Sequence, residues 1–188
     1  MNNLKPIIFL IPVIALVLTG ILYFYFLKKA TNKNIFKRLV FTITVIAFLL
    51  NLIWELVQMP LYNGSSYSIE QIAFCTLASV ADALMVLLLY FGVAFIFRSP
   101  LWIQHLKWQQ ITIVILIGGT GAVLAEMRHL SSGNWAYVDS MPIIPIVNVG
   151  MSPVLQFMIL PLLIYFLSFL LLKKYEKKIT DHRNYDIN

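Results

Sequence analysis

Three acidic residues, Glu55, Asp82 and Glu126, lie within long apolar stretches of the sequence or at their ends. An ionisable side chain inside a membrane segment costs roughly 2.5–3.5 kcal/mol on insertion scales, so it needs a partner, a cavity or a function. Burial favours the protonated form of a carboxylic acid, and a protonated carboxyl group beside an ionised one makes a general acid and base pair. These three residues are therefore the candidate catalytic groups.

Helical spacing places two of these acids. Asn51, Glu55 and Gln58 recur at intervals of four and three residues, so they share one face of a helix. In the next apolar segment, Asp82 follows Ile72 by ten residues and lies roughly 15 Å further along the helix. That depth puts Asp82 near the middle of a membrane, deeper than the other charges.

Further polar and aromatic residues fall at the same end of their predicted helices. Gln156 lies one turn inside the last apolar segment, and Glu126 ends the segment before it. We expect a cavity there, floored by Asp82 and suited to a lipid-soluble substrate. Its substrate-binding residues would be Asn51, Trp54, Gln58, Trp135, Tyr137 and Gln156, and its rim and walls would include Glu55, Glu126 and Tyr62.

One spacing is also found in metal sites. Glu126 and His129 place a carboxylate and an imidazole on one helix face, as in di-iron helix bundles, but such bundles need two of these pairs. The other two histidines, His105 and His182, are predicted at the opposite end of the helices, and the chain has one cysteine. We therefore expect no metal site and no cofactor.

The composition indicates a membrane protein. Of 188 residues, 60% are hydrophobic and 12% are charged, whereas soluble domains are about 45–50% apolar and about 25% charged. A helix crosses the roughly 30 Å hydrocarbon core with about 20 apolar residues. The sequence therefore predicts an all-α bundle of five transmembrane helices, over residues 6–27, 39–57, 72–97, 111–125 and 153–172.

The basic residues predict the orientation of the bundle. All of them except Lys5 and Arg128 follow the first, third or fifth predicted helix. Because positive charges remain on the cytoplasmic side, we expect the amino terminus outside and the carboxyl terminus in the cytoplasm. The net charge of +6 then indicates contact with membrane lipids, not with nucleic acid. We predict one transmembrane domain over residues 1–174 and a polar, frayed cytoplasmic tail over residues 175–188.

Two local patterns concern the fourth helix. Gly118 with Ala122, and Gly121 with Ala125, are pairs of small residues four apart, which let helices approach closely. After this helix, residues 131–150 are rich in glycine, proline and aromatic residues. We expect them to form a structured cap or a shallow re-entrant turn at the outer face, because prolines prevent a regular spanning helix.

Several of these residues resemble a known family. The stretch from Asn51 to Tyr62 reads W-E-x-x-Q-x-P-L-Y from Trp54 onward, and it is followed by Asp82 between two alanines. Together with the region from Glu126 to Met141-Pro142, it resembles a family of small bacterial multi-pass membrane proteins. This resemblance implies a location in the bacterial inner membrane.

A looser resemblance concerns the membrane-embedded lycopene cyclases and the emopamil-binding-type sterol isomerases. It depends on Glu126, the following Gly133-x-Trp135, and a polar residue after Pro153. The resemblance implies acidic and aromatic residues in a lipid-facing cavity between helices. Gln156 departs from the pattern, because a carboxylate would be expected at that position.

These residues leave three functions open. The first is a membrane enzyme, an isomerase or cyclase, that acts on an isoprenoid or other lipid by acid/base proton transfer in an outer-leaflet cavity. The second is a proton- or cation-coupled carrier. Five helices without inverted repeats make a poor transporter on their own, so a carrier would have to form homo-oligomers. The third is a non-catalytic binding or assembly subunit of a membrane complex.

Overall fold

The computed structural model describes residues 10–185, with side chains as far as Lys177. The basic Lys5 and the expected start of the first span, residues 6–9, lie outside the described residues, as do residues 186–188 of the expected tail. Within the described range, five α-helices are each long and apolar enough to cross a membrane, which confirms the expected all-α, five-span bundle. They are α1 (Leu10–Lys29), α2 (Lys33–Gln58), α3 (Ile69–Ile96), α4 (Trp108–Ser131) and α5 (Met151–Tyr185).

The helices extend beyond the apolar runs that predict them. The side chain of Asn32 caps α2 by accepting hydrogen bonds of 3.1 Å from the backbone N–H groups of Asn34 and Ile35. At the other end of the chain, α5 continues to Tyr185, so the tail expected to fray from residue 175 is helical as far as that residue. The reason is that Pro161 is the last helix breaker in α5, and the residues after it are mostly good helix formers.

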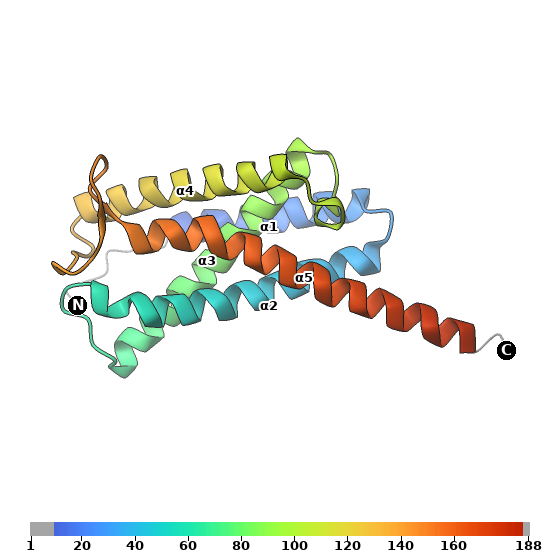
Figure 1. The fold of residues 1–188 in the computed structure, drawn as a ribbon, viewed down its shortest axis with the longest axis horizontal. Helices are drawn as coiled ribbons and strands as arrows, with labels where there is room; N and C mark the ends of the chain where they lie inside the picture. Colours follow the sequence, from blue (N-terminus) through green and yellow to red (C-terminus); the bar gives the residue numbers. More distant parts are fainter. Residues whose placement is uncertain (1–9, 186–188) are drawn as a thin grey trace.

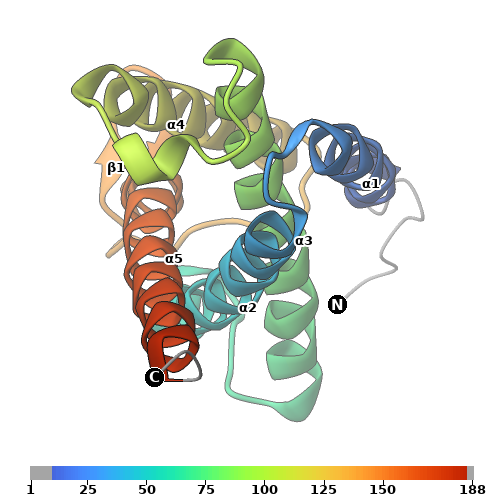
Figure 2. The ribbon, with the colours of Figure 1, turned by 90° about the vertical axis from the view of Figure 1, so that its right-hand side faces the viewer.

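Successive helices run in opposite directions, so the connections gather at two ends (Figure 1). We call the end that carries residues 62–68 and 132–150 the loop end, and the other the basic end. α2 packs against α3 and α5, α4 packs against α5, and α1 lies at the side, mainly on α3 (Figure 2). Among the residues with described side chains, the basic ones at the basic end are Lys28, Lys29, Lys33, Lys37, Arg38, Arg98, Lys107, Lys173, Lys174 and Lys177.

Buried aromatic side chains hold the connection between α3 and α4 in place at the basic end. This connection includes the short 3₁₀ helix η3 (Trp102–His105). The Trp102 indole packs against the rings of Tyr90 and Tyr165 and donates a 3.1 Å hydrogen bond to the Tyr90 carbonyl. The Tyr165 hydroxyl donates a 2.7 Å hydrogen bond to the carbonyl of Val86. Because each buried polar atom in this group has a partner, η3 is held firmly onto α3 and α5.

The expected cap at the loop end is a pair of hydrogen-bonded loops. After α4, the strands β1 (Ile143–Ile144) and β2 (Val149–Gly150) form a small antiparallel hairpin. Before α3, residues that follow the 3₁₀ helix η2 (Met59–Leu61) pair with residues 136–138 around a Tyr62–Tyr137 bridge. Backbone hydrogen bonds join Asn63 N to Ala136 O at 2.8 Å and Val138 N to Leu61 O at 3.1 Å. The cap therefore ties the end of α2 to the end of α4.

The helices α4 and α5 approach each other closely at Gly118. A Cβ atom on Gly118 would overlap the backbone carbonyl oxygen of Phe157. That carbonyl would normally accept a hydrogen bond from the residue four positions later, which is Pro161 and has no N–H group. The Gly118 Cα–H group faces the unpaired oxygen, a weak contact that helps to satisfy it. Of the two predicted small-residue pairs, Gly118 with Ala122 lies in this contact, whereas Gly121 and Ala125 are exposed.

We expect Gly118→Ala to lower the free energy of unfolding by about 1–3 kcal/mol, because α4 must move away from α5 to accept the methyl group. The matched control is Gly121→Ala, since a Cβ atom there meets nothing within 4 Å. This control should leave stability unchanged or raise it by up to about 1 kcal/mol. Unfolding in detergent, followed by circular dichroism, measures both. Equal stability of the two variants would contradict the proposed role of Gly118.

Candidate functional site

The side chain of Gln156 on α5 is the centre of a polar network between three helices. It is 1% exposed, and its Nε2 lies 2.9 Å from Asn51 Oδ1, 3.3 Å from Glu55 Oε1 and 3.2 Å from Asp82 Oδ2. Asn51 and Glu55 belong to α2 and Asp82 belongs to α3. One amide group therefore holds together polar side chains that are up to 105 positions apart in the sequence.

The carboxyl groups of Glu55 and Asp82 also contact each other directly, at hydrogen-bonding distance. Both side chains are only half-buried, although Asp82 lies in the middle part of α3. The sequence placed these two acids on different helices without showing which faces meet. Gln156, which contacts both, explains how the faces are brought together.

A second amide extends the network toward the loop end. Gln58, one turn after Glu55, donates a 2.8 Å hydrogen bond to Glu55 Oε1 and a 3.1 Å hydrogen bond to Gln156 Oε1. The hydroxyl of Ser152 donates to Gln58 Oε1 at 2.8 Å. The shared face of Asn51, Glu55 and Gln58 is thus confirmed, and that face meets α5.

Sequence reasoning missed Ser152 as a member of this network. The signal was present, because Ser152 precedes Gln156 by one helical turn and lies on the same face of α5. Its place at the start of α5, next to Pro153, suggested only a helix start.

The third acid, Glu126, lies apart from this pair. Glu126 is 7% exposed, and its Oε2 accepts a 3.2 Å hydrogen bond from the indole N–H of Trp135 and another from the hydroxyl of Tyr137. Both donors come from the cap that follows α4. A carboxylate with two such donors is stabilised in its ionised form. The three candidate acids therefore form a contacting pair and a separate, differently bonded carboxylate.

Aromatic rings at the loop end lie near both groups of acids. The Tyr62 ring packs against Trp135 at 6.1 Å and against Tyr137 at 5.5 Å between ring centroids. Burial raises the pKa of the Tyr62 phenol far above its usual range, and the negative charges of Glu126 and Glu55 raise it further. Burial and the hydrogen bond to Glu126 likewise raise the pKa of Tyr137. Both phenols therefore stay protonated, and the hydroxyl of Tyr137 donates to Glu126.

The surroundings of Gly150 show how tightly the side chains of the cap are packed. A Cβ atom on Gly150 would lie 3.0 Å from the ring of Tyr137 and 3.0 Å from the side chain of Met141. Gly150 ends the hairpin and packs against Tyr137, and Met151, the next residue, begins α5. The hairpin therefore connects Tyr137 to the helix that carries Gln156.

Two residues that the sequence associated with the site have other surroundings. Trp54, expected as a wall of the cavity, packs against the main apolar core, and its buried indole N–H has no hydrogen-bond partner. His129 stacks on Trp135 at 4.1 Å, and its Nδ1 lies 2.7 Å from the side-chain nitrogen of Asn134. Among the side chains that the structure describes, up to Lys177, no group of three or more His, Cys, Asp or Glu residues is placed to hold a metal ion.

The centre of the site also differs from the cavity that the sequence predicted. We expected open space above Asp82, with Gln156 at the rim. Instead, the Gln156 amide occupies the middle of the group and contacts Asp82 itself. A glutamine at this position, where a cyclase-like pattern would have a carboxylate, supplies N–H donors to two acids that otherwise only accept.

Comparison with known proteins adds no relative, because no protein-family model, no curated protein and no solved structure matches the chain. The fold is that of a five-helix membrane bundle with polar side chains inside it. The chemistry of the site therefore has to follow from its own geometry.

We expect Gln156→Leu to lower the free energy of unfolding by about 1–3 kcal/mol, because it removes the α5 donor from the buried Asn51 and from Asp82. Gln109→Leu, at an exposed position of α4, is the matched control and should be neutral. Thermal unfolding of the purified variants in one detergent measures the difference. A Gln156→Leu protein as stable as the control would show that the network contributes nothing to folding.

Proposed function

We propose that this protein is a membrane enzyme that moves protons onto and off a lipid-soluble alkene, such as an isoprenoid. The observation that carries this proposal is the contact between Glu55 and Asp82 inside the bundle, held by Gln156. Two carboxyl groups in hydrogen-bond contact cannot both be ionised, so such a pair keeps one proton. A carboxyl pair of this kind can give a proton to a substrate and later recover one.

The separate position of Glu126 supports a second role in the same reaction. Trp135 and Tyr137 donate hydrogen bonds to it, and the ring of Tyr62 packs against both of these residues. Carboxylates and aromatic faces both stabilise a carbocation. These groups therefore suit the intermediate that forms when an alkene is protonated.

The reaction then needs no cofactor. A proton from the Glu55–Asp82 pair adds to one carbon of a double bond, whose π electrons form the new C–H bond and leave a cation on the other carbon. Loss of a proton from a neighbouring carbon to a carboxylate restores a double bond at a new place. If a second double bond attacks the cation first, the product is a ring. The substrate gains one proton and loses one, so its composition does not change.

We also infer the orientation that places this site. The loop end faces the outside and the basic end faces the cytoplasm, because Arg128 is the only basic side chain that the structure describes at the loop end. The site would then open toward the outer leaflet of a bacterial inner membrane. The polar groups support this direction, since the loop-end cap and the network both lie in that half of the bundle.

The proposed chemistry predicts deuterium transfer from solvent to lipid. The purified protein in liposomes made up in D₂O, with lycopene or undecaprenol as the probe, should introduce deuterium into the probe. Mass spectrometry of the extracted probe measures this. Asp82→Asn, Glu55→Gln and Glu126→Gln should each lower the rate by roughly a hundredfold or more, because general acid and base groups contribute about 10²–10⁴-fold.

Glu70→Gln is the control for these variants, because Glu70 is an exposed acid at the start of α3. It should keep the rate of the unchanged protein. If no probe gains deuterium, or if all three acid variants keep full turnover, the enzyme proposal fails. Proton flux into empty liposomes that depends on Asp82 would instead favour the carrier.

The orientation gives a separate test by cysteine labelling. In a Cys75→Ala background, Ser140→Cys at the loop end should react with an impermeant maleimide added to intact cells. His105→Cys at the basic end should react only after the cells are opened. Both positions are exposed, so a lack of reaction reports the side of the membrane. The opposite labelling pattern would reverse the orientation.

A further inference from the structure

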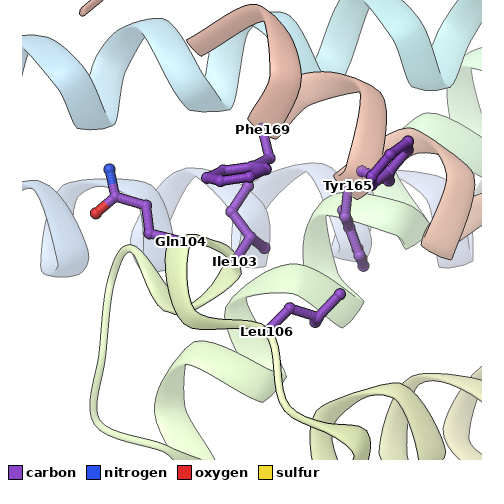
Figure 3. A pocket seen from close by; sticks show the side chains of 6 residues that line it. Ile103, Gln104, Leu106, Tyr165 and Phe169 are labelled. Atoms are coloured by element: carbon purple, nitrogen blue, oxygen red, sulfur yellow. The ribbon is translucent and has the colours of Figure 1, made fainter. Parts of the chain in front are cut away.

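A pocket at the basic end has none of the three candidate acids in its lining and has a different character (Figure 3). It lies between η3 and α5, on the side of the bundle away from α1 (Figure 2). Its lining consists of Ile103, Gln104, Leu106, Tyr165, Phe166 and Phe169.

The lining favours a hydrocarbon chain over a polar ligand. Tyr165 presents its ring to the pocket, while its hydroxyl is already bonded to the carbonyl of Val86. Gln104 has the one amide side chain in the lining. Leu106 is 42% exposed and Phe166 is 51% exposed, so the pocket is open at the side where lipid surrounds the bundle. An acyl chain from the membrane can therefore reach it.

Two basic residues follow the residues that line the pocket in the sequence. Lys107 follows Leu106 directly and precedes α4, and it is exposed. On α5, Lys173 comes four residues after Phe169 and seven after Phe166, so the three share one helix face. Lys173 is also exposed, and it lies further toward the basic end than the two rings. The pocket therefore has an apolar interior and a cationic edge.

We propose that this pocket binds one anionic phospholipid, with an acyl chain between η3 and α5 and the phosphate group near Lys107 and Lys173. Charge complementarity selects this ligand, because basic pockets between membrane helices bind anionic head groups. The acyl chain contributes separately, since each buried methylene group stabilises binding by burial of apolar surface. The lipid would fix η3 against α5, and none of the residues of the proposed catalytic site is involved.

Native mass spectrometry can test this inference. The delipidated protein in detergent is mixed with phosphatidylglycerol and phosphatidylcholine that carry the same acyl chains. We expect one phosphatidylglycerol to stay bound at concentrations at which phosphatidylcholine does not. The double variant Lys107→Gln, Lys173→Gln should weaken phosphatidylglycerol binding by roughly 30-fold.

Two further variants separate the contributions. Lys28→Gln with Lys29→Gln removes the same charge from the same end, but on α1, and should leave binding unchanged. Leu106→Trp fills the open side of the pocket and should weaken binding of both lipids, with an unchanged thermal midpoint as the check on folding. Glycerol phosphate alone should not compete, because it has no acyl chain.

The outcomes decide between a site and a general lipid shell. Equal binding of the two lipids would overturn the proposal, and so would an equal effect of the two lysine pairs. Retention of lipid by the Leu106→Trp protein would show that no chain enters the pocket, which also overturns it. Competition by glycerol phosphate would assign the site to a free phosphate ester instead of a membrane lipid.

Discussion

The fold depends on one physical constraint, which is that polar side chains inside an apolar bundle must satisfy each other. Asn51, Glu55 and Asp82 bring mostly hydrogen-bond acceptors into the region between α2, α3 and α5. Gln156, which is 1% exposed, donates to these residues, and Gln58 adds a second donor to Glu55. Without that amide, Asn51 on α2 and Asp82 on α3 would lose their partner from α5, and unsatisfied polar groups are costly in hydrocarbon.

The same constraint explains the close approach of two backbones at Gly118. Pro161 leaves the carbonyl of Phe157 without its helical hydrogen bond, and Gly118 allows α4 to come close enough to cover that oxygen. At the basic end, Trp102 and Tyr165 bond to backbone carbonyls of α3 in a similar way. Polar atoms therefore determine where the apolar helices of this bundle meet, because apolar side chains pack against lipid as well as against each other.

The three acids form a contacting pair and a single separate residue, and these different surroundings decide which chemical role each acid is suited to. Glu55 and Asp82 contact each other, which suits a shared proton, whereas Glu126 accepts hydrogen bonds from two donors of the cap. Tyr62 is close enough to both groups for the charges of all three acids to act on it. Three like residues thus have two environments, and different environments are what give chemically identical groups different roles.

The sequence alone determined the number of helices, their apolar character and the shared face of Asn51, Glu55 and Gln58. These properties are local, because composition and a 3.6-residue period can be read within one segment. It did not determine that Gln156 would be the centre of the network, that Trp54 would turn to the main core, or that Gly118 and not Gly121 would touch α5. Those outcomes depend on how the helices cross. Only the tertiary structure fixes these crossings, since each apolar helix offers several faces that would pack almost equally well.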